Sequence, residues 1–86
     1  EGSVSKMARS NQSVKAYFMA IVKKGTEHEV AGKLRKLSGV TEVLVTYGLY
    51  DIVVRIEARN LGELDALITE MRKIEEIVQT STLVGA

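Results

Sequence analysis

Four consecutive residues, Gly48-Leu49-Tyr50-Asp51, bring together a flexible backbone, an aromatic ring and a carboxylate. Glycine adopts positive φ angles readily and lets a ligand approach the main chain closely. A carboxylate attracts an ammonium group, and such charge-assisted hydrogen bonds are stronger than neutral ones. This carboxylate stands at the start of the apolar run 52–56, which is typical of a strand. The combination indicates a binding turn rather than a catalytic centre.

The sequence offers little else that could do chemistry. It has no Cys and a single His, His28, which lies between Glu27 and Glu29. Ligands on one face of a helix are three or four residues apart, so this triplet is not spaced for a metal, and no metal or cofactor is expected. No Ser-His-Asp set, Cys nucleophile or glycine-rich phosphate loop is recognisable. Asp51 could equally be a turn residue that bonds its own backbone, so two roles for it stay open.

Composition narrows the class of protein. The 86 residues, 45% of them hydrophobic, suffice for one domain with a modest core. The 12 basic and 11 acidic residues leave a net charge of +1 and are interleaved, so no direct DNA binding is expected. No apolar stretch reaches the roughly 18 residues of a membrane span. The absence of Cys fits a reducing compartment, and we expect a cytoplasmic protein without membrane contact.

Strand-like and helical patterns alternate after residue 13. Residues 1–13 show no sustained period and are expected to be a disordered tail or a remnant of cloning, whereas 14–86 form the folded domain. Capping boxes that start a helix are predicted at Thr26 with Glu29 and at Asn60 with Glu63, because both pairs have the required spacing. The predicted elements are strands at 14–23, 40–47, 50–58 and 77–84, with a turn at Gly48 and Leu49, and helices at 26–38 and 61–74.

The order β-α-β-β-α-β predicts an α+β fold of the ferredoxin-like type, a four-stranded antiparallel sheet with two helices on one face. Right-handed crossovers place the first and third strands at the centre of the sheet. The first strand is apolar on both faces, as Phe18 and Met19 illustrate, so the helix-free face should also be buried. A second copy of the chain would bury it. The sequence therefore predicts a homodimer through the sheet, a dimeric α/β barrel.

The hairpin and the last strand also resemble a known family. The hairpin reads Tyr47-Gly48-Leu49-Tyr50-Asp51 followed by Ile-Val-Val, and 80–84 reads Thr-Ser-Thr-Leu-Val. With the segment 64–70 between them, they resemble the effector-binding domain of the Lrp/AsnC regulators. This domain is also called RAM, for regulation of amino acid metabolism, and the resemblance covers 14–84. Family members usually carry an N-terminal helix-turn-helix domain, so the chain resembles the stand-alone form that keeps only the sensing domain.

The resemblance implies an amino-acid sensor that acts in the transcriptional regulation of amino acid metabolism. It implies dimers that assemble further, often into octamers, bind an amino acid effector between dimers and co-assemble with full-length Lrp/AsnC regulators. The ligand-binding residues that it implies are Gly48, Leu49, Tyr50, Asp51, Thr80 and Thr82. Ordinary strand propensity explains the two threonines equally well. A small enzyme of the dimeric α/β-barrel type and a purely structural assembly unit are the alternatives.

Overall fold

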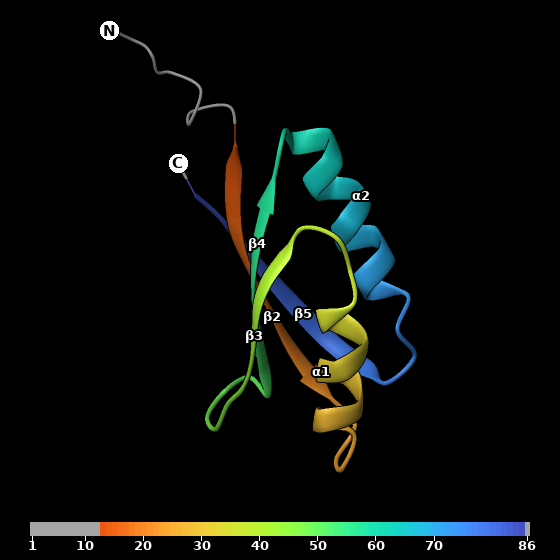
Figure 1. Cartoon of the computed structure of the whole chain (residues 1–86). Helices are drawn as coiled ribbons and strands as arrows, with labels where there is room; N and C mark the ends of the chain where they lie inside the picture. The colour runs from red at the N-terminus through yellow and green to blue at the C-terminus, as the bar shows by residue number, and fades with distance from the viewer. Residues whose placement is uncertain (1–12, 86) are drawn as a thin grey trace, which may run out of the picture.

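The computed structural model describes residues 13–85, which form one layer of strands beside one layer of helices (Figure 1). The tail predicted for 1–13 lies outside the described residues, except for Ser13. The element order confirms the predicted ferredoxin-like arrangement. The elements are β2 (Val14–Val22), α1 (Glu27–Arg35), β3 (Val40–Val45), β4 (Ile52–Ala58), α2 (Leu61–Arg72) and β5 (Ile77–Val84).

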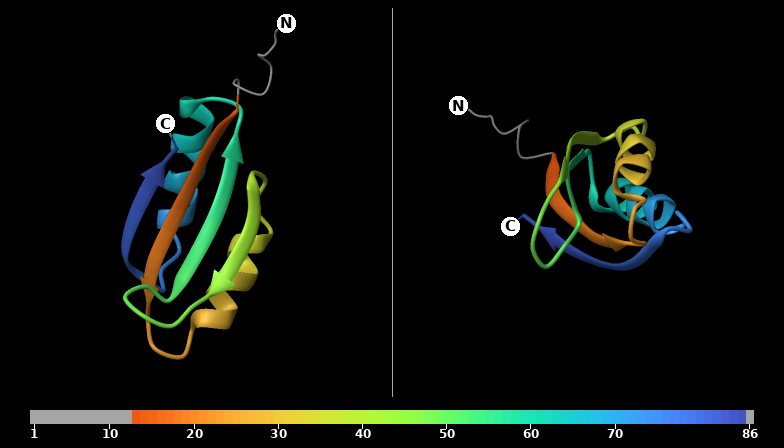
Figure 2. Two further views of the ribbon diagram at one scale, coloured as in Figure 1. Left: turned by 90° about the vertical axis from the view of Figure 1, so that its left-hand side faces the viewer. Right: turned by 90° about the horizontal axis from the view of Figure 1, so that it is seen from below.

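The sheet has four antiparallel strands in the order β3-β4-β2-β5, so the first and third strands lie at its centre, as predicted. The left view of Figure 2 shows the strands from the helix-free side, with β5 and β3 at the two edges. Phe18 pairs with Val54 of β4 and with Thr82 of β5. Directly paired residues share a face of the sheet, so this register assigns a face to each paired side chain of β5.

Both helices cover one face of the sheet, and the core lies between the two layers. Helix α1 contributes Val30 and Leu34, and α2 contributes Leu64 and Met71. Leu61, the first residue of α2, is 64% exposed. The strand residues of the core are Ala16, Phe18, Ala20 and Val22 of β2, Val43 of β3, and Ile52, Val54, Ile56 and Ala58 of β4.

The two helix starts differ from each other. At α2, Asn60 Oδ1 accepts a hydrogen bond of 2.8 Å from the N–H of Glu63, as the capping box predicts. At α1, Thr26 makes no side-chain cap. Its hydroxyl donates instead to the carbonyl of Lys23 at 2.6 Å, because the short turn after β2 brings that oxygen within reach. The capping box predicted at Thr26 is therefore wrong.

Two predicted boundaries also move. Helix α1 ends at Arg35, earlier than predicted, and the chain continues in tighter turns in which the N–H of Leu37 bonds the carbonyl of Leu34 at 3.1 Å. The connection between β3 and β4 comprises residues 46–51, which we call the hairpin loop. It is longer than the two-residue turn predicted at Gly48 and Leu49, because the ladder between the strands already stops at the pair Val45–Ile52.

Candidate functional site

The hairpin loop is closed by hydrogen bonds at its base. The N–H of Thr46 donates to the carbonyl of Asp51 at 2.8 Å, and the hydroxyl of Thr46 donates to the carbonyl of Tyr50, also at 2.8 Å. Gly48 has a φ of 127°, a conformation that side-chain-bearing residues rarely adopt. Thr46 is a member of the site that sequence reasoning missed. The sequence did contain a signal for Thr46, since a residue with a hydroxyl group close to a predicted turn can bond the turn backbone.

The tip of the hairpin loop presents large side chains to solvent. Tyr47 is fully exposed and Leu49 is 80% exposed, whereas Tyr50 is partly buried. Figure 1 shows the loop at the lower left, bending to the side of the sheet that faces away from the helices. Exposed apolar groups held on a hydrogen-bonded base are suited to contact with another molecule.

The N–H and the carboxylate of Asp51 bond β2, whereas its carbonyl bonds the hairpin loop. Its N–H donates to the carbonyl of Ala20 at 2.9 Å, and its Oδ2 accepts from the N–H of Val22 at 2.9 Å. This side-chain bond joins residues 29 positions apart in the sequence and is partly buried. The sequence left open a hydrogen bond from the Asp51 side chain to the backbone of its own turn. In the structure this side chain bonds the central strand β2 instead. Val22 becomes the backbone partner that no local pattern could reveal.

Thr80 and Thr82 lie on the opposite side of the sheet from the hairpin loop. They pair with Ala20 and Phe18, whose side chains are buried under the helices, so the threonine side chains point to the helix-covered side. The loop bends to the helix-free side (Figures 1 and 2). The structure therefore gathers Gly48, Leu49, Tyr50 and Asp51 in one loop. It does not bring the two threonines into the same cavity of one chain.

The helix-free face carries an apolar surface with an ion pair set into it. Arg55 Nη1 lies 2.8 Å from Glu57 Oε2, and the same nitrogen donates to the hydroxyl of Thr41 at 3.1 Å. Both charged side chains are only about one-third exposed. We define the open face as the side chains that the register places on this side of the four strands, namely Lys15, Tyr17, Met19, Ile21, Glu42, Leu44, Val53, Arg55, Glu57, Gln79, Ser81 and Leu83.

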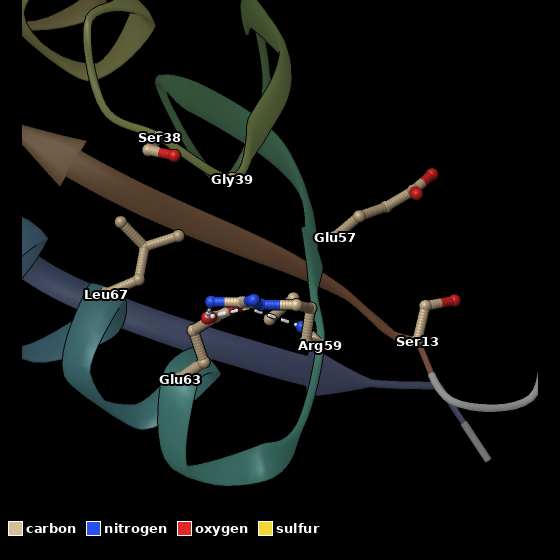
Figure 3. Close-up of a pocket in the computed structure, with 8 residues that line it drawn as sticks. Ser13, Ser38, Gly39, Glu57, Arg59, Glu63 and Leu67 are labelled. Atoms are coloured by element: carbon tan, nitrogen blue, oxygen red, sulfur yellow. Dashed lines mark hydrogen bonds and ion pairs between the residues drawn. The ribbon is translucent and has the colours of Figure 1, made fainter.

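A hollow lies at the other end of β4 from the hairpin loop. It measures about 610 Å³, and Ser38, Gly39, Arg59, Glu63 and Leu67 are among its lining residues (Figure 3). Its guanidinium and carboxylate already bond each other, Arg59 Nη2 to Glu63 Oε2 at 2.8 Å. None of the predicted ligand-binding residues lines this hollow. The Arg59–Glu63 ion pair lies at the start of α2.

The described residues carry no assembly suited to metal chemistry. Within 13–85, no group of three or more His, Cys, Asp or Glu side chains could hold an ion. His28 is exposed. In the same part of the chain, no helix is long and apolar enough to cross a membrane.

Comparison with known proteins matches residues 15–85 to the Lrp/AsnC ligand binding domain. The chain is 36% identical over 72 residues to the HTH-type transcriptional regulator FL11 of Pyrococcus furiosus. That alignment covers 84% of this chain and 48% of the regulator, so the chain spans about half the length of this curated relative.

Two solved structures have the same fold. The hypothetical protein PHS023 from Pyrococcus horikoshii superposes with a TM-score of 0.81 at 40% identity, covering 85% of this chain and 89% of its own. AsnC of E. coli superposes with a TM-score of 0.79 at 27% identity, covering 98% of this chain and 59% of its own. The similar curated proteins are named as transcriptional regulators rather than as enzymes. The chain belongs to the Lrp/AsnC ligand-binding-domain family.

Proposed function

We propose that this chain is an effector-binding and oligomerisation module that senses an amino acid, acts in transcriptional regulation of amino acid metabolism and catalyses no reaction. The observation that carries the proposal is the closed hairpin loop. It offers an exposed tip and the carboxylate of Asp51 on a hydrogen-bonded base. A module of this kind acts by assembling with other copies, including full-length regulators of the family, and does not contact DNA itself.

A dimer through the open face is the first part of the proposal. Tyr17, Leu44 and Leu83 are each about half exposed on this face, and all three belong to different strands. A contiguous apolar surface of this kind is stabilised when a second copy removes it from water. Arg55 and Glu57 remain paired with each other when a second copy covers the face, so dimerisation leaves neither charge without a partner.

An effector site shared between copies is the second part. An amino acid is a zwitterion, so its ammonium group needs a carboxylate, which Asp51 supplies, and its carboxylate needs N–H or hydroxyl donors. The proposed hydrogen-bond donors and walls of the amino-acid site come from two segments. They are the backbone of Gly48, Leu49 and Tyr50 and the hydroxyls of Thr80 and Thr82. Because the loop and the threonines lie on opposite sides of one sheet, we place the loop of one protomer against the threonines of another. Further assembly beyond the dimer, such as an octamer, is part of the same proposal.

Thermal denaturation of the full chain in the presence of each of the twenty amino acids tests the proposal. A ligand that binds only the folded state raises the midpoint as its concentration rises. We expect one amino acid, or a chemically related group of them, to do so. Unchanged midpoints for all twenty at millimolar concentrations would contradict the sensing role.

Threonine variants then locate the site. Thr80→Val and Thr82→Val remove a hydroxyl with little change in shape, and we expect each to weaken the response to the active amino acid. Thr69→Val is the matched control, because the Thr69 hydroxyl donates to the carbonyl of Asp65 within α2 at 2.9 Å. If both β5 variants respond like the parent, the threonines take no part in the site.

A further inference from the structure

We infer that Asp51 is the positioning residue of the hairpin loop, and that its carboxylate does this through the N–H of Val22. The part of the inference that concerns ligand affinity rests on the proposed function. The part that concerns the position of the loop does not, since it depends only on bonds within the chain. The two carboxylate oxygens thereby have different roles, one toward the protein and the other toward a ligand.

The need for this bond arises from the unequal lengths of β2 and β4. The ladder between them ends at the pair Ala20–Ile52, while β2 continues to Val22. The carbonyl of Ala20 accepts a hydrogen bond from Asp51, so it points to the β4 side. The N–H and the carbonyl of one strand residue point to the same side, and this side repeats every second residue. The N–H of Val22 therefore points to a place where β4 has no residue. Oδ2 of Asp51 fills that place at 2.9 Å.

The burial of Val22 makes the loss of this hydrogen bond costly. Val22 is 5% exposed, so its N–H has little access to water if the carboxylate is removed. A buried donor without an acceptor is costly, and native proteins nearly always provide one. The register of the sheet thus demands an acceptor at position 51, whatever the loop binds.

Three bonds converge on Asp51 and determine where the hairpin loop sits. Its N–H bonds Ala20, its carbonyl accepts from Thr46 and its Oδ2 accepts from Val22. The loop is thereby tied both to its own opposite end and to the central strand. Within residues 13–85, Oδ1 makes no hydrogen bond, yet no buried side-chain oxygen is left unpaired, so Oδ1 reaches solvent. It is the oxygen free to meet an ammonium group.

Two substitutions at one position separate the two roles. Asp51→Asn keeps a neutral oxygen that can accept from Val22 but removes the charge, whereas Asp51→Ala removes both. Asp65→Ala is the matched control, because Asp65 is an exposed acid on α2. The measurement is amide hydrogen exchange by NMR on the full chain without ligand, read at Val22 and at the amides of the loop base.

We expect Asp51→Ala to speed exchange at Val22 by about tenfold or more, the factor that corresponds to the loss of one hydrogen bond of about 1.4 kcal/mol. Asp51→Asn should exchange nearly as slowly as the parent, and Asp65→Ala should equal it. Unchanged protection of Val22 in Asp51→Ala would overturn the positioning role. Fast exchange in Asp51→Asn as well would overturn the claim that a neutral acceptor suffices.

The same variants separate this inference from the proposed function. With an amino acid that stabilises the parent, Asp51→Asn should keep the protection of Val22 and lose most of the ligand-induced rise in the denaturation midpoint. If Asp51→Asn responds fully to the ligand, Oδ1 is not the ammonium acceptor, while the positioning role stands. If no amino acid stabilises the parent, the sensing role fails, and the exchange data still decide whether Asp51 positions the loop.

Discussion

Arg59 and Glu63 face each other across the first turn of α2 and are joined by three hydrogen bonds. The guanidinium of Arg59 donates to Glu63 Oε2 from Nε at 3.0 Å and from Nη2 at 2.8 Å, and the N–H of Arg59 donates to Oε1 at 2.8 Å. Asn60 between them caps the N–H of Glu63. The ion pair is exposed and contributes little by itself, but the bonds to backbone N–H groups satisfy donors that a helix start leaves unpaired.

Removal of the cap should destabilise the domain. Asn60→Ala leaves the N–H of Glu63 without its side-chain acceptor, and we expect a loss of about 1 kcal/mol in the free energy of unfolding. Asn60→Asp keeps an acceptor and should stay close to the parent. Urea denaturation of the three proteins measures the difference. Equal midpoints for Asn60→Ala and the parent would show that solvent replaces the cap without cost.

The same carboxylate predicts a dependence of stability on pH. Hydrogen bonds from the Arg59 guanidinium, and then from the Arg59 N–H, hold the pKa of Glu63 below its ordinary value of 4.5. A pKa lowered by folding adds stability above the unfolded value, and that stability disappears as the pH falls through the folded value. The denaturation midpoint should therefore drop more steeply on acidification below about pH 4.5 in the parent than in Glu63→Gln.

Thermal denaturation in a series of acidic buffers measures this slope, with Glu75→Gln as a control for removal of an exposed acid in a turn. The effect should be small, because the pair is screened by solvent. A parent and Glu63→Gln whose midpoints fall in parallel would show that the Arg59–Glu63 contact is not maintained in solution.

Two glycines should respond to alanine in opposite directions. Gly32 lies inside α1, and an added Cβ would meet nothing within 4 Å, so Gly32→Ala should stabilise by about 0.5–1 kcal/mol through helix propensity. Gly39 has a φ of 97°, and a Cβ there would lie 3.2 Å from Leu67 Cδ2 and 3.3 Å from the carbonyl oxygen of Glu57. Gly39→Ala should destabilise by about 1–3 kcal/mol.

Chemical denaturation of both alanine variants checks the pair. A Gly39→Ala protein as stable as the parent would mean that the turn before β3 relaxes freely, contrary to the hydrogen bond of 2.9 Å from the N–H of Glu57 to the carbonyl of Gly39.

Assembly should depend on the open face. Met19 lies near the middle of this face, and Met19→Asp would bury an unpaired charge in a dimer, so the measured mass should shift toward one chain. Ala66→Asp adds the same charge at an exposed position of α2 and should leave assembly unchanged. Light scattering at micromolar concentration measures both variants and the parent. A parent that already has the mass of one chain would refute the proposed dimer.

Duplex DNA should not be bound specifically by this chain alone. Its net charge is +1, and basic and acidic residues are interleaved, so few phosphates can be neutralised at once. Gel-shift assays over a range of salt concentrations should show at most weak binding that salt abolishes. A sequence-dependent complex that survives moderate salt would contradict this expectation.

Local patterns predicted most of the fold because their causes are local. Alternation in 52–56 puts Ile52, Val54 and Ile56 on one face wherever the strand lies, since successive side chains of a strand point to opposite faces. The last strand was predicted with its observed bounds, Ile77–Val84. Asn60 with Glu63 formed the predicted cap because donor and acceptor are three residues apart on one chain segment.

Tertiary structure decided the features that depend on distant partners. Thr26 and Glu29 have the spacing of a capping box, but the Thr26 hydroxyl donates to the carbonyl of Lys23. The turn between β2 and α1 brings these two groups together, and the residue spacing does not specify the shape of that turn. The carboxylate of Asp51 accepts a hydrogen bond from the N–H of Val22, because β2 extends two residues beyond its last pair with β4. The pairing of β5 with β2 places the Thr80 side chain on the helix-covered side, so a site shared by Thr80 and the hairpin loop needs two protomers. Sequence determined which residues are strand, helix and turn, because those choices follow from chain geometry. The register between strands far apart in sequence determined which polar groups meet, because a hydrogen bond exists only where folding brings its two atoms together.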